Sequence, residues 1–406
     1  MKYENCPVQC GAFLLPAQEN MERWPVVACD QYTAEPAYWE KAYEIVGDAP
    51  SALQLILPEA FLHEDGGRIE KIHQTMEQYI AQNVFARCVS GMVLLERVTE
   101  SGARIGVVTA VDLEEYDYTR GAKPQIRPTE GTVTERIPPR LKVRQGAAVE
   151  LSHVLLLIDD PQRSVIEPIY AMRDQLPMVY DVELMQHGGH VRGWAIEEGK
   201  LTEQMQENLL KLKETLTENS PLIAVGDGNH SLATARAHWL NVRENLTEEE
   251  RKVHPARYAM AEIENLHCDA LIFEPIHRLV FGKTADEVLD MLPGAKETNG
   301  KYDALIVGAD KDIPVVFEKP LHPLPVGTVQ MNLDQHKDVE IDYIHGENSV
   351  RELVAAGRGT GILLPAMDKS LLFPAVAQGG VLPRKTFSMG EAHEKRFYME
   401  ARKIIL

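Results

Sequence analysis

The sequence is poor in basic residues, and this shortage excludes one class of function. Lysine and arginine total 42 against 61 aspartate and glutamate residues, which gives a formal net charge of −19 at pH 7. A protein that grips nucleic acid normally carries a basic patch, because phosphate contacts supply most of the non-specific affinity. No long basic block is present. We therefore expect no nucleic acid among its partners.

Cysteine is also scarce, with five residues scattered along 406. An odd, sparse set predicts reduced thiols in a reducing compartment rather than a disulfide framework. Cys6 and Cys10 lack the second pair of ligands that a structural zinc site requires. The cysteines therefore predict neither a disulfide scaffold nor a zinc site.

Long apolar runs are missing as well. None approaches the roughly 20 residues that a membrane-spanning helix needs. The start, MKYENCPVQCGAFLLPAQ, lacks the basic residues and long apolar stretch of a secretion signal. We expect a cytoplasmic protein with no membrane partner. A hydrophobic content of 44% over this length is enough for two or three domains with full cores.

What the chain does have is a distinctive stretch at 221–240. The apolar run PLIAV predicts a buried strand, and the spacing of Leu232, Ala235 and Trp239 after it predicts a helix. Gly226 and Gly228 permit a tight turn between the two. The free amides at the start of such a helix attract an anion, so the turn predicts a phosphate site.

Four polar residues crowd this turn: Asp227, Asn229, His230 and Ser231. They favour a functional site, since two ionisable and two polar groups converge where a ligand can enter. A polar loop in which Asn229 or Ser231 caps the helix is the structural alternative, and the spacing alone does not separate the two.

The segment IAVGDGNHSLATA resembles the ADGHHRYETA signature of the family known as domain of unknown function 1015. Other segments resemble blocks of that family in the same order: PQIRPTEGTVTER at 124–136, EPIHRL at 274–279 and LPRKTF at 382–387. The signature turn is also similar, more distantly, to that of the ParB/sulfiredoxin superfamily, which includes ADP-dependent free serine kinase. This resemblance implies a ParB/sulfiredoxin-like core, ATP or ADP with Mg²⁺ as cofactor, and free serine as acceptor.

The sequence departs from the family signature at two positions. Asn229 stands where the first histidine is expected, and Ser231 stands where the signature has an arginine. An arginine there would neutralise phosphate charge. We expect Arg236, Arg278 or Lys385 to supply that charge instead.

The 124–136 segment is rich in proline and glycine, which excludes a long helix. Glu130, Thr132 and Arg136 are therefore expected on an ordered loop, where acidic, hydroxyl and basic groups suit contact with a substrate or phosphate. A surface loop held by its own ion pairs is the alternative.

The run VLLLIDDP at 154–161 predicts a buried strand that ends in Asp159 and Asp160. Mg²⁺ prefers such hard oxygen ligands, so the pair is a candidate metal site. The alternative is that both carboxylates begin the next helix, SVIEPIYAMRD, where they complement the helix dipole.

The remaining patterns predict a mixed α+β fold with hairpins rather than a regular doubly wound sheet. The runs GMVLLERV and RIGVVTAV predict one hairpin, and the runs PMVYDVELMQ and HVRGWAI predict a second. His187 and His190, in the second turn, are expected to be exposed residues rather than metal ligands. Amphipathic spacing predicts helices in TAEPAYWEKAYEIV, RIEKIHQTMEQYI and LTEQMQENLLKLKETL.

A change of composition places a soft boundary near 290, which divides the chain into a main α+β domain at 1–290 and a smaller C-terminal α/β region at 291–406. We expect the C-terminal region to contribute to the same site. His277 and Arg278 follow an apolar strand, His345 lies between a strand and a helix, and Lys385 lies in the PRKTF block. Each of them can face an anion.

Together these features favour a nucleotide-dependent phosphotransferase that acts on the hydroxyl of a small molecule. The candidate catalytic residues are Glu130, then Asp227, then His230. Thr132 is the candidate substrate contact, and Asp159 and Asp160 are the candidate metal ligands. The candidate phosphate ligands are Gly226, Gly228, Asn229, Ser231, Arg136, His277, Arg278, His345 and Lys385. A non-catalytic nucleotide or amino-acid sensor is the alternative function, and a homodimer is the alternative to a monomer.

Overall fold

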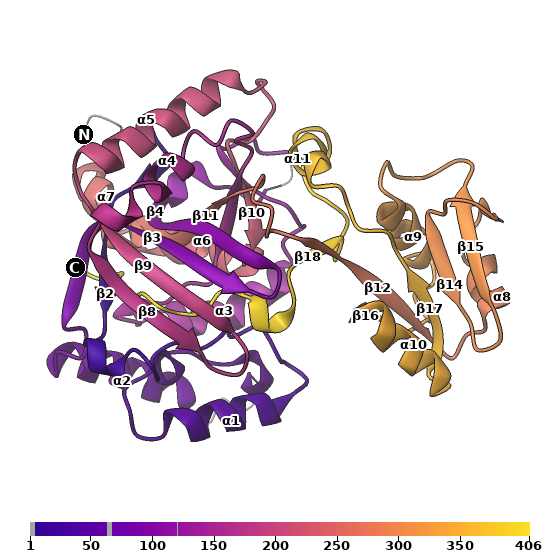
Figure 1. Cartoon of the computed structure of the whole chain (residues 1–406), viewed down its shortest axis with the longest axis horizontal. Helices are drawn as coiled ribbons and strands as arrows, with labels where there is room; N and C mark the ends of the chain where they lie inside the picture. Colours follow the sequence, from indigo (N-terminus) through magenta and orange to yellow (C-terminus); the bar gives the residue numbers. More distant parts are fainter. Residues whose placement is uncertain (1–4, 63–66, 120) are drawn as a thin grey trace. The chain divides into compact units, whose positions relative to one another are not determined.

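A computed structural model describes residues 5–62, 67–119 and 121–406. The chain forms two compact units (Figure 1). The first contains the chain up to Leu271 together with residues 376–380 and 392–406, and the second contains residues 272–375 and 381–391. The units divide before β12 (Phe273–Phe281), whereas the sequence placed a soft boundary near 290. The reason is that β12 pairs with β16 (Ile341–His345) and β17 (Gly359–Leu363).

The first unit is built on a mixed ten-stranded sheet with the order β5-β10-β7-β11-β4-β3-β9-β8, where β1 pairs with β4 and β2 with β3. Both predicted hairpins are confirmed, as β3–β4 and β8–β9. The strands are β1 (Val8–Gln9), β2 (Gly11–Leu15), β3 (Arg87–Thr99), β4 (Gly102–Asp112), β5 (Ile126–Pro128), β7 (Leu155–Ile158), β8 (Met178–Leu184), β9 (Gly189–Glu197), β10 (Ile223–Asp227) and β11 (Tyr258–Asn265).

The helices of this unit include all those predicted from apolar spacing. They are α1 (Pro36–Val46), α2 (Arg68–Ala81), α3 (Ile137–Arg144), α4 (Glu167–Tyr170), α5 (Lys200–Thr215), α6 (Asn229–Arg243) and α7 (Glu248–Val253). α3 begins directly after the 124–136 loop. Pro138 and Pro139 are tolerated in its first turn, because a missing amide costs no intrahelical bond there. α4 is much shorter than the helix predicted after Asp160.

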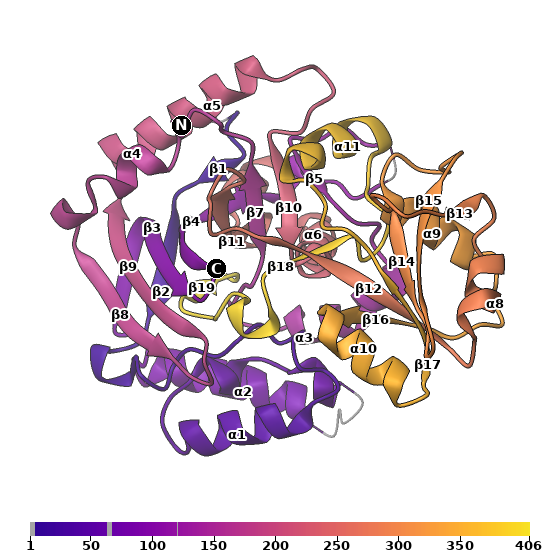
Figure 2. The same ribbon diagram turned by 45° about the vertical axis from the view of Figure 1, so that its right-hand side comes forward.

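Two apolar cores lie on opposite faces of the sheet, as the alternation along β3 shows. Val93 and Leu95 pack with residues of α1 and α2, whereas Met92 and Leu94 pack with residues of α5 and α6. Successive strand residues point to opposite faces, so one strand serves both cores. Figures 1 and 2 show α1 and α2 on one side of this unit and α5 on the other.

The last segment of the chain, residues 392–406, is held inside the first unit by buried arginines. Arg97 and Arg104 of the β3–β4 hairpin donate hydrogen bonds to the main-chain carbonyls of His393, Glu394 and Lys395. Beyond them, β19 (Arg402–Lys403) pairs with β6 (Val149–Glu150). This C-terminal segment is therefore part of the first unit's core.

The second unit is a seven-stranded antiparallel sheet with the order β13-β15-β14-β17-β12-β16, and β18 pairs with β12 (Figure 2). The strand and helix expected on either side of His345 are present as β16, which ends at His345, and α10 (Glu347–Ala355). The remaining elements are α8 (Ala285–Asp290), β13 (Ala295–Glu297), β14 (Ala304–Val307), β15 (Asp312–Phe317), α9 (Pro325–Leu333) and β18 (Phe387–Met389). The helix α11 (Leu372–Gly379) is shared, since residues 372–375 belong to this unit and residues 376–379 to the first.

The mixed sheets and helices confirm the α+β class. The ParB/sulfiredoxin-like core stays a prediction. Within the described part of the chain, no helix has both the length and the apolar character that a membrane crossing requires.

Candidate functional site

The predicted strand–turn–helix is confirmed at the end of β10. The pairing of β10 with β7 shifts register between Val225 and Asp227, so Gly226 lies in an irregularity of the strand. Gly228 has φ 79° and ψ 27°, and a Cβ built on it would lie 3.0 Å from the Cα of Val154. Glycine is needed for the left-handed conformation and for the close approach. No side chain caps α6, so its first amides lack an acceptor within the helix.

The loop after β5 is fastened to this turn. The amide of Thr129 donates to Oδ1 of Asn229 (3.2 Å), and its hydroxyl donates to the carbonyl of Val225 (2.6 Å). The amide of Val133 donates to Nε2 of His230 (3.3 Å). Asn229 therefore anchors the neighbouring loop instead of capping its own helix, and Glu130 lies between the two anchored points.

A cation that the sequence analysis missed lies at the turn. Nζ of Lys395 is 2.9 Å from Oδ2 of Asp227, and the lysine side chain is 10% exposed. The amide of Gly228 donates to the other oxygen of Asp227 (2.9 Å). Burial would raise the pKa of Asp227, but Lys395 and the nearby His153 outweigh it, so the pKa falls below its usual range. Asp227 is therefore a weak proton acceptor.

His153 adds a second positive charge. Its Nε2 lies 3.6 Å from Oδ2 of Asp30, and its Nδ1 lies 2.7 Å from the hydroxyl of Tyr398. Burial would lower the pKa of His153, but Asp30, the thiol of Cys29 and Asp227 together raise it to about 10. The imidazole is consequently protonated at neutral pH.

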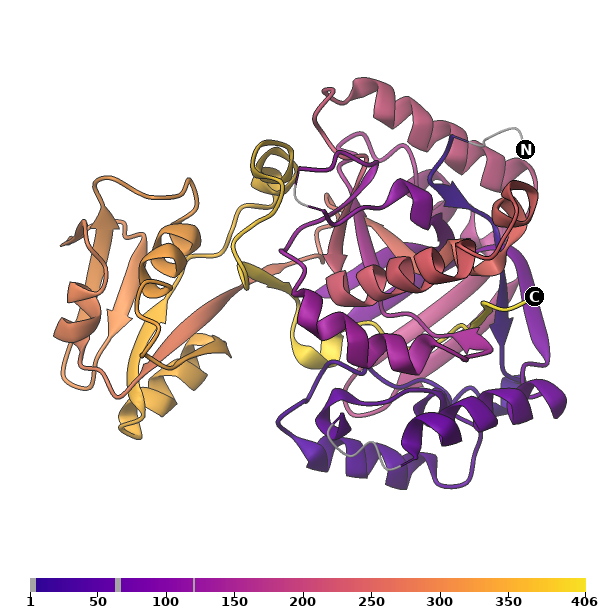
Figure 3. The same ribbon diagram turned by 180° about the vertical axis from the view of Figure 1, so that it is seen from behind.

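A cavity of about 130 Å³ adjoins the first turns of α6, where Ser231 and Thr234 line it. These two residues lie side by side on one face of the helix, next to the face that carries the core-facing Leu232 and Ala235. α3 packs beside α6, and both helices run along the same side of the unit (Figure 3). The other polar lining residues are Cys29, Glu59, Arg140, Arg144, Glu150, His153 and Tyr398, and the apolar ones are Leu55, Ile56, Leu57, Leu62, Met76, Val143, Ala147, Val149 and Leu151.

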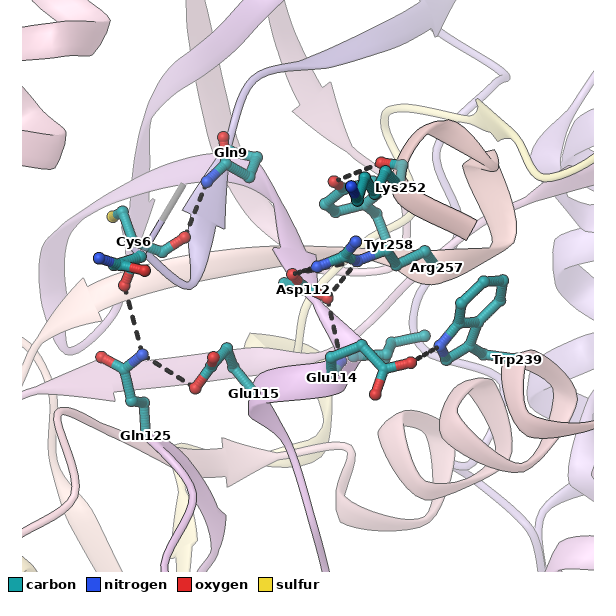
Figure 4. Close-up of polar contacts among 12 residues, drawn as sticks. Cys6, Gln9, Asp112, Glu114, Glu115, Gln125, Trp239, Lys252, Arg257 and Tyr258 are labelled. Atoms are coloured by element: carbon teal, nitrogen blue, oxygen red, sulfur yellow. Dashed lines mark hydrogen bonds and ion pairs between the residues drawn. The ribbon is translucent and has the colours of Figure 1, made fainter. Parts of the chain in front are cut away.

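α6 is fixed in place from outside the cavity by one carboxylate, Glu114 (Figure 4). It accepts hydrogen bonds from Nε1 of Trp239 (2.6 Å) and from Arg243 (2.8 Å). Arg236 donates to the carbonyl of Leu113 and also contacts Glu114 at 3.4 Å. Arg236 is therefore held by Leu113 and Glu114. It does not supply the positive charge that the signature arginine would bring at position 231.

The aspartates at the end of β7 have structural partners. Asp160 is fully buried and accepts hydrogen bonds from the amides of Ser164 (2.6 Å) and Val165 (2.9 Å). Asp159 lies 2.7 Å from Nε2 of His267. Among the described residues, no group of three or more potential metal-binding side chains is found. These contacts favour the structural alternative for the pair, and a magnesium ion at it stays an unsupported prediction.

The other predicted loop residues differ in exposure. Arg136 is exposed at the end of a single 3₁₀ turn, Thr134–Arg136, whereas Thr132 and Glu130 are half-buried. His190, predicted to be an exposed turn residue, lies at the β8–β9 hairpin and contacts Asp181 and Glu183. Within the 124–136 segment, Glu130 is thus less exposed than Arg136.

His277, Arg278, His345 and Lys385 belong to the second unit. Arg278 is fully buried and donates to main-chain carbonyls of Ile276, Arg384 and Lys385. Nδ1 of His277 accepts from the amide of Leu364 (3.1 Å), and burial lowers the pKa of this imidazole. These contacts give Arg278 and His277 structural roles. A contribution of this unit to the phosphate site stays a prediction.

With this geometry established, comparison with known proteins gives a family. Residues 12–342 match the model described as "Protein of unknown function (DUF1015)". The chain belongs to this family. The match ends before the C-terminal segment, so the domain of unknown function 1015 model does not include Lys395 or Tyr398. No curated protein matches.

Several solved structures resemble this family member. Free serine kinase in complex with AMP is 15% identical with a TM-score of 0.40, and the match covers 74% of this chain and 92% of that one. A conserved hypothetical protein from Pyrococcus furiosus is 12% identical with a TM-score of 0.37, over 70% and 90% of the two chains. SbnI with a C-terminal truncation, from Staphylococcus aureus, is 10% identical with a TM-score of 0.37, over 70% and 82%. At these low values the function has to be argued from the site itself.

Proposed function

We propose that the protein is a nucleotide-dependent phosphotransferase that moves a phosphoryl group to the hydroxyl of a small molecule. The observation that carries the proposal is the cap-free start of α6 at Gly228, next to a cavity that the same helix lines with Ser231 and Thr234. Unpaired helix amides bind phosphate, and an adjoining cavity offers room for a second substrate. Both substrates of a phosphoryl transfer would then meet at one turn.

Charge at the turn supports this proposal. Phosphoryl transfer depends mainly on positioning and on neutralising phosphate charge. Lys395 and the protonated His153 are the cations that accompany the α6 amides, and both lower the pKa of Asp227. We assign phosphate binding to the amides after Gly228, to Ser231 and to Lys395.

The chemical step would use a carboxylate of the anchored loop. The acceptor oxygen forms a new P–O bond, the bond from phosphorus to the departing nucleotide oxygen breaks, and the hydroxyl proton passes to the base. Glu130 is the first choice, because Thr129 and Val133 fasten its loop to the turn. Asp227 is less suitable, because its lowered pKa makes it a poor proton acceptor.

The sequence resemblance implies ATP or ADP as the donor and free serine as one candidate acceptor. Asp159 and Asp160 do not fit a magnesium site, since an imidazole and two amides already use their oxygens. No step of the proposal depends on that pair.

The test is a direct search for product. Purified protein is incubated with Mg²⁺, ATP or ADP, and a panel of hydroxy compounds that includes serine, and ³¹P NMR detects a new phosphate ester. We expect an ester that disappears with Glu130→Gln while nucleotide binding persists. Glu135→Gln, at an exposed position of the same segment, is the matched control and should retain activity.

The alternative is a sensor that binds a nucleotide or an amino acid without turnover, and the replacement of the signature arginine by Ser231 favours it. Saturable thermal stabilisation by ATP or ADP, with no ester from any acceptor, would decide for the sensor and against the phosphotransferase.

A further inference from the structure

The volume of the cavity beside α6 indicates the size of the ligand that it can hold. Its volume of about 130 Å³ is close to that of the roughly 150 Å³ apolar cavity that holds benzene in an engineered protein. Free serine is about as large, but its ammonium, carboxylate and hydroxyl groups would place polar atoms against the apolar wall. A ring or a branched chain of six or seven heavy atoms would cover it.

The charges around the cavity are already matched. Arg140 pairs with Glu59, Arg144 pairs with Glu150 at 2.6 Å, and His153 faces Asp30. A zwitterion such as serine would have to compete with these pairs, and the desolvation of its own two charges would add to the cost. An uncharged ligand does not compete with these ion pairs and has no charge to desolvate.

One polar group of the cavity does lack a partner. Nε of Arg144 is buried and has no hydrogen-bond acceptor among the described residues, although Arg144 lines the cavity. This nitrogen has almost no accessible surface, so a ligand in the cavity meets other polar groups there, such as the hydroxyls of Ser231 and Thr234. The cavity therefore suits a molecule with an apolar body and at least one hydroxyl or carbonyl oxygen.

We infer that this cavity binds an uncharged hydroxy compound whose apolar body is about the size of benzene, in preference to free serine. Naming this ligand the phosphoryl acceptor rests on the proposed function, whereas its binding does not. The hydroxyl would meet polar lining residues such as Ser231 and Thr234, and the apolar body would meet apolar ones such as Leu57 and Met76.

The inference is tested by calorimetric titration and thermal shift of the full chain with benzyl alcohol, 3-methyl-1-butanol, glycerol and serine. We expect saturable binding of benzyl alcohol that is at least about tenfold tighter than that of glycerol or serine, because each buried carbon contributes to affinity. Tighter binding of serine, or no saturable binding of either apolar alcohol, would overturn it.

Two variants locate the binding. Ala147→Leu fills the cavity and should weaken benzyl alcohol binding by about tenfold or more, whereas Met76→Ala enlarges it and should shift preference to the longer 3-phenyl-1-propanol. Ala42→Leu, a buried alanine of α1 outside the cavity lining, controls for overpacking. Unchanged alcohol preference in Met76→Ala would overturn the inference even if Ala147→Leu fails to fold.

The same experiments separate this inference from the proposed function. Binding of benzyl alcohol that responds to both variants, without any phosphate ester from ATP or ADP, would sustain the ligand class and remove the phosphotransferase. If an ester formed from serine and from no other compound, the proposed phosphotransferase function would stand. The inference that the cavity prefers an uncharged hydroxy compound would then be wrong.

Discussion

Nζ of Lys395 lies 2.9 Å from Oδ2 of Asp227, which joins the C-terminal segment to the turn that begins α6. The two residues are 168 positions apart in the sequence. Arg97 and Arg104 hold the main-chain carbonyls of Lys395 and Glu394, and Arg396 pairs with Glu262 at 2.8 Å. The position of the lysine is thus determined by a buried network rather than by its own ion pair.

We predict that Lys395→Met weakens the binding of ATP, ADP and inorganic pyrophosphate by about 10- to 100-fold, the loss expected for one charge-assisted hydrogen bond. Isothermal titration measures it. Lys403→Met, an exposed lysine of the same segment, should bind as the wild type does. Because the variant leaves Asp227 without its cation, the double variant with Asp227→Asn should recover stability but not affinity. Recovery of affinity in the double variant would show that Asp227, not the missing lysine, caused the loss.

We predict that Gly228→Ala destabilises the first unit by about 1–3 kcal/mol, because alanine strains a left-handed conformation and its Cβ would approach Val154. Chemical denaturation provides the free energy of unfolding. Gly67→Ala is the matched control, since Gly67 has the same left-handed conformation (φ 85°, ψ 8°) before α2 but nothing within 4 Å of a built Cβ. Equal losses in the two variants would mean that the contact with Val154 contributes nothing.

We predict that stability falls as pH rises from about 6.5 to about 10, because the pKa of His153 is raised to about 10 in the folded protein. A raised pKa means that the folded state holds the proton more tightly, so the stabilisation is complete below the unfolded pKa. It is lost progressively as pH passes through the folded pKa. His153→Gln should remove this part of the pH dependence, as followed by thermal melts from pH 6 to 10. An unchanged slope would contradict the contact with Asp30.

A second pH prediction concerns Glu264, a buried carboxyl near Arg104 in the network that holds the C-terminal segment. Burial raises its pKa to about 8 against the lowering effect of Arg104, and the neighbouring Glu262 adds to the rise. The folded state therefore retains a proton that the unfolded state releases, so stability declines between about pH 4.5 and 8. Glu264→Gln should flatten that decline, because the amide resembles the protonated acid. Glu297→Gln, at an exposed site, should leave the decline intact.

A feature of the site can be predicted from the sequence when the residues that form it lie close together in the chain. Leu232, Ala235 and Trp239 recur with helical spacing, so α6 and its core-facing side could be predicted from a few neighbouring residues. The same holds for the hairpins, whose turns lie between their strands.

Lys395 and Tyr398 could not be predicted in this way, because no local pattern records that the chain returns to β10 after 168 residues. The expectation that Arg278 faces an anion met the same limit. Its sequence context suggested an anion, whereas the fold encloses it among main-chain carbonyls contributed by Arg384 and Lys385. Asp159 and Asp160 show a further limit, since a strand ending in two carboxylates is compatible with a metal site and with a capped turn.

The last prediction asks whether Lys395 takes over the role of the arginine that the family signature has at position 231. Ser231 lies in the first turn of α6 and lines the cavity, so an arginine there would place a guanidinium beside the same amides. In a chain that carries Lys395→Met, we therefore expect Ser231→Arg to restore pyrophosphate binding to within about tenfold of the wild type, since one cation replaces another. Ser231→Met in the same background is the control for size, and it should restore nothing. The arginine would also intrude on the cavity, so benzyl alcohol binding should weaken as pyrophosphate binding recovers. Equal recovery with methionine would show that the first turn of α6 responds to bulk, and charge exchange between positions 231 and 395 would then be the wrong explanation.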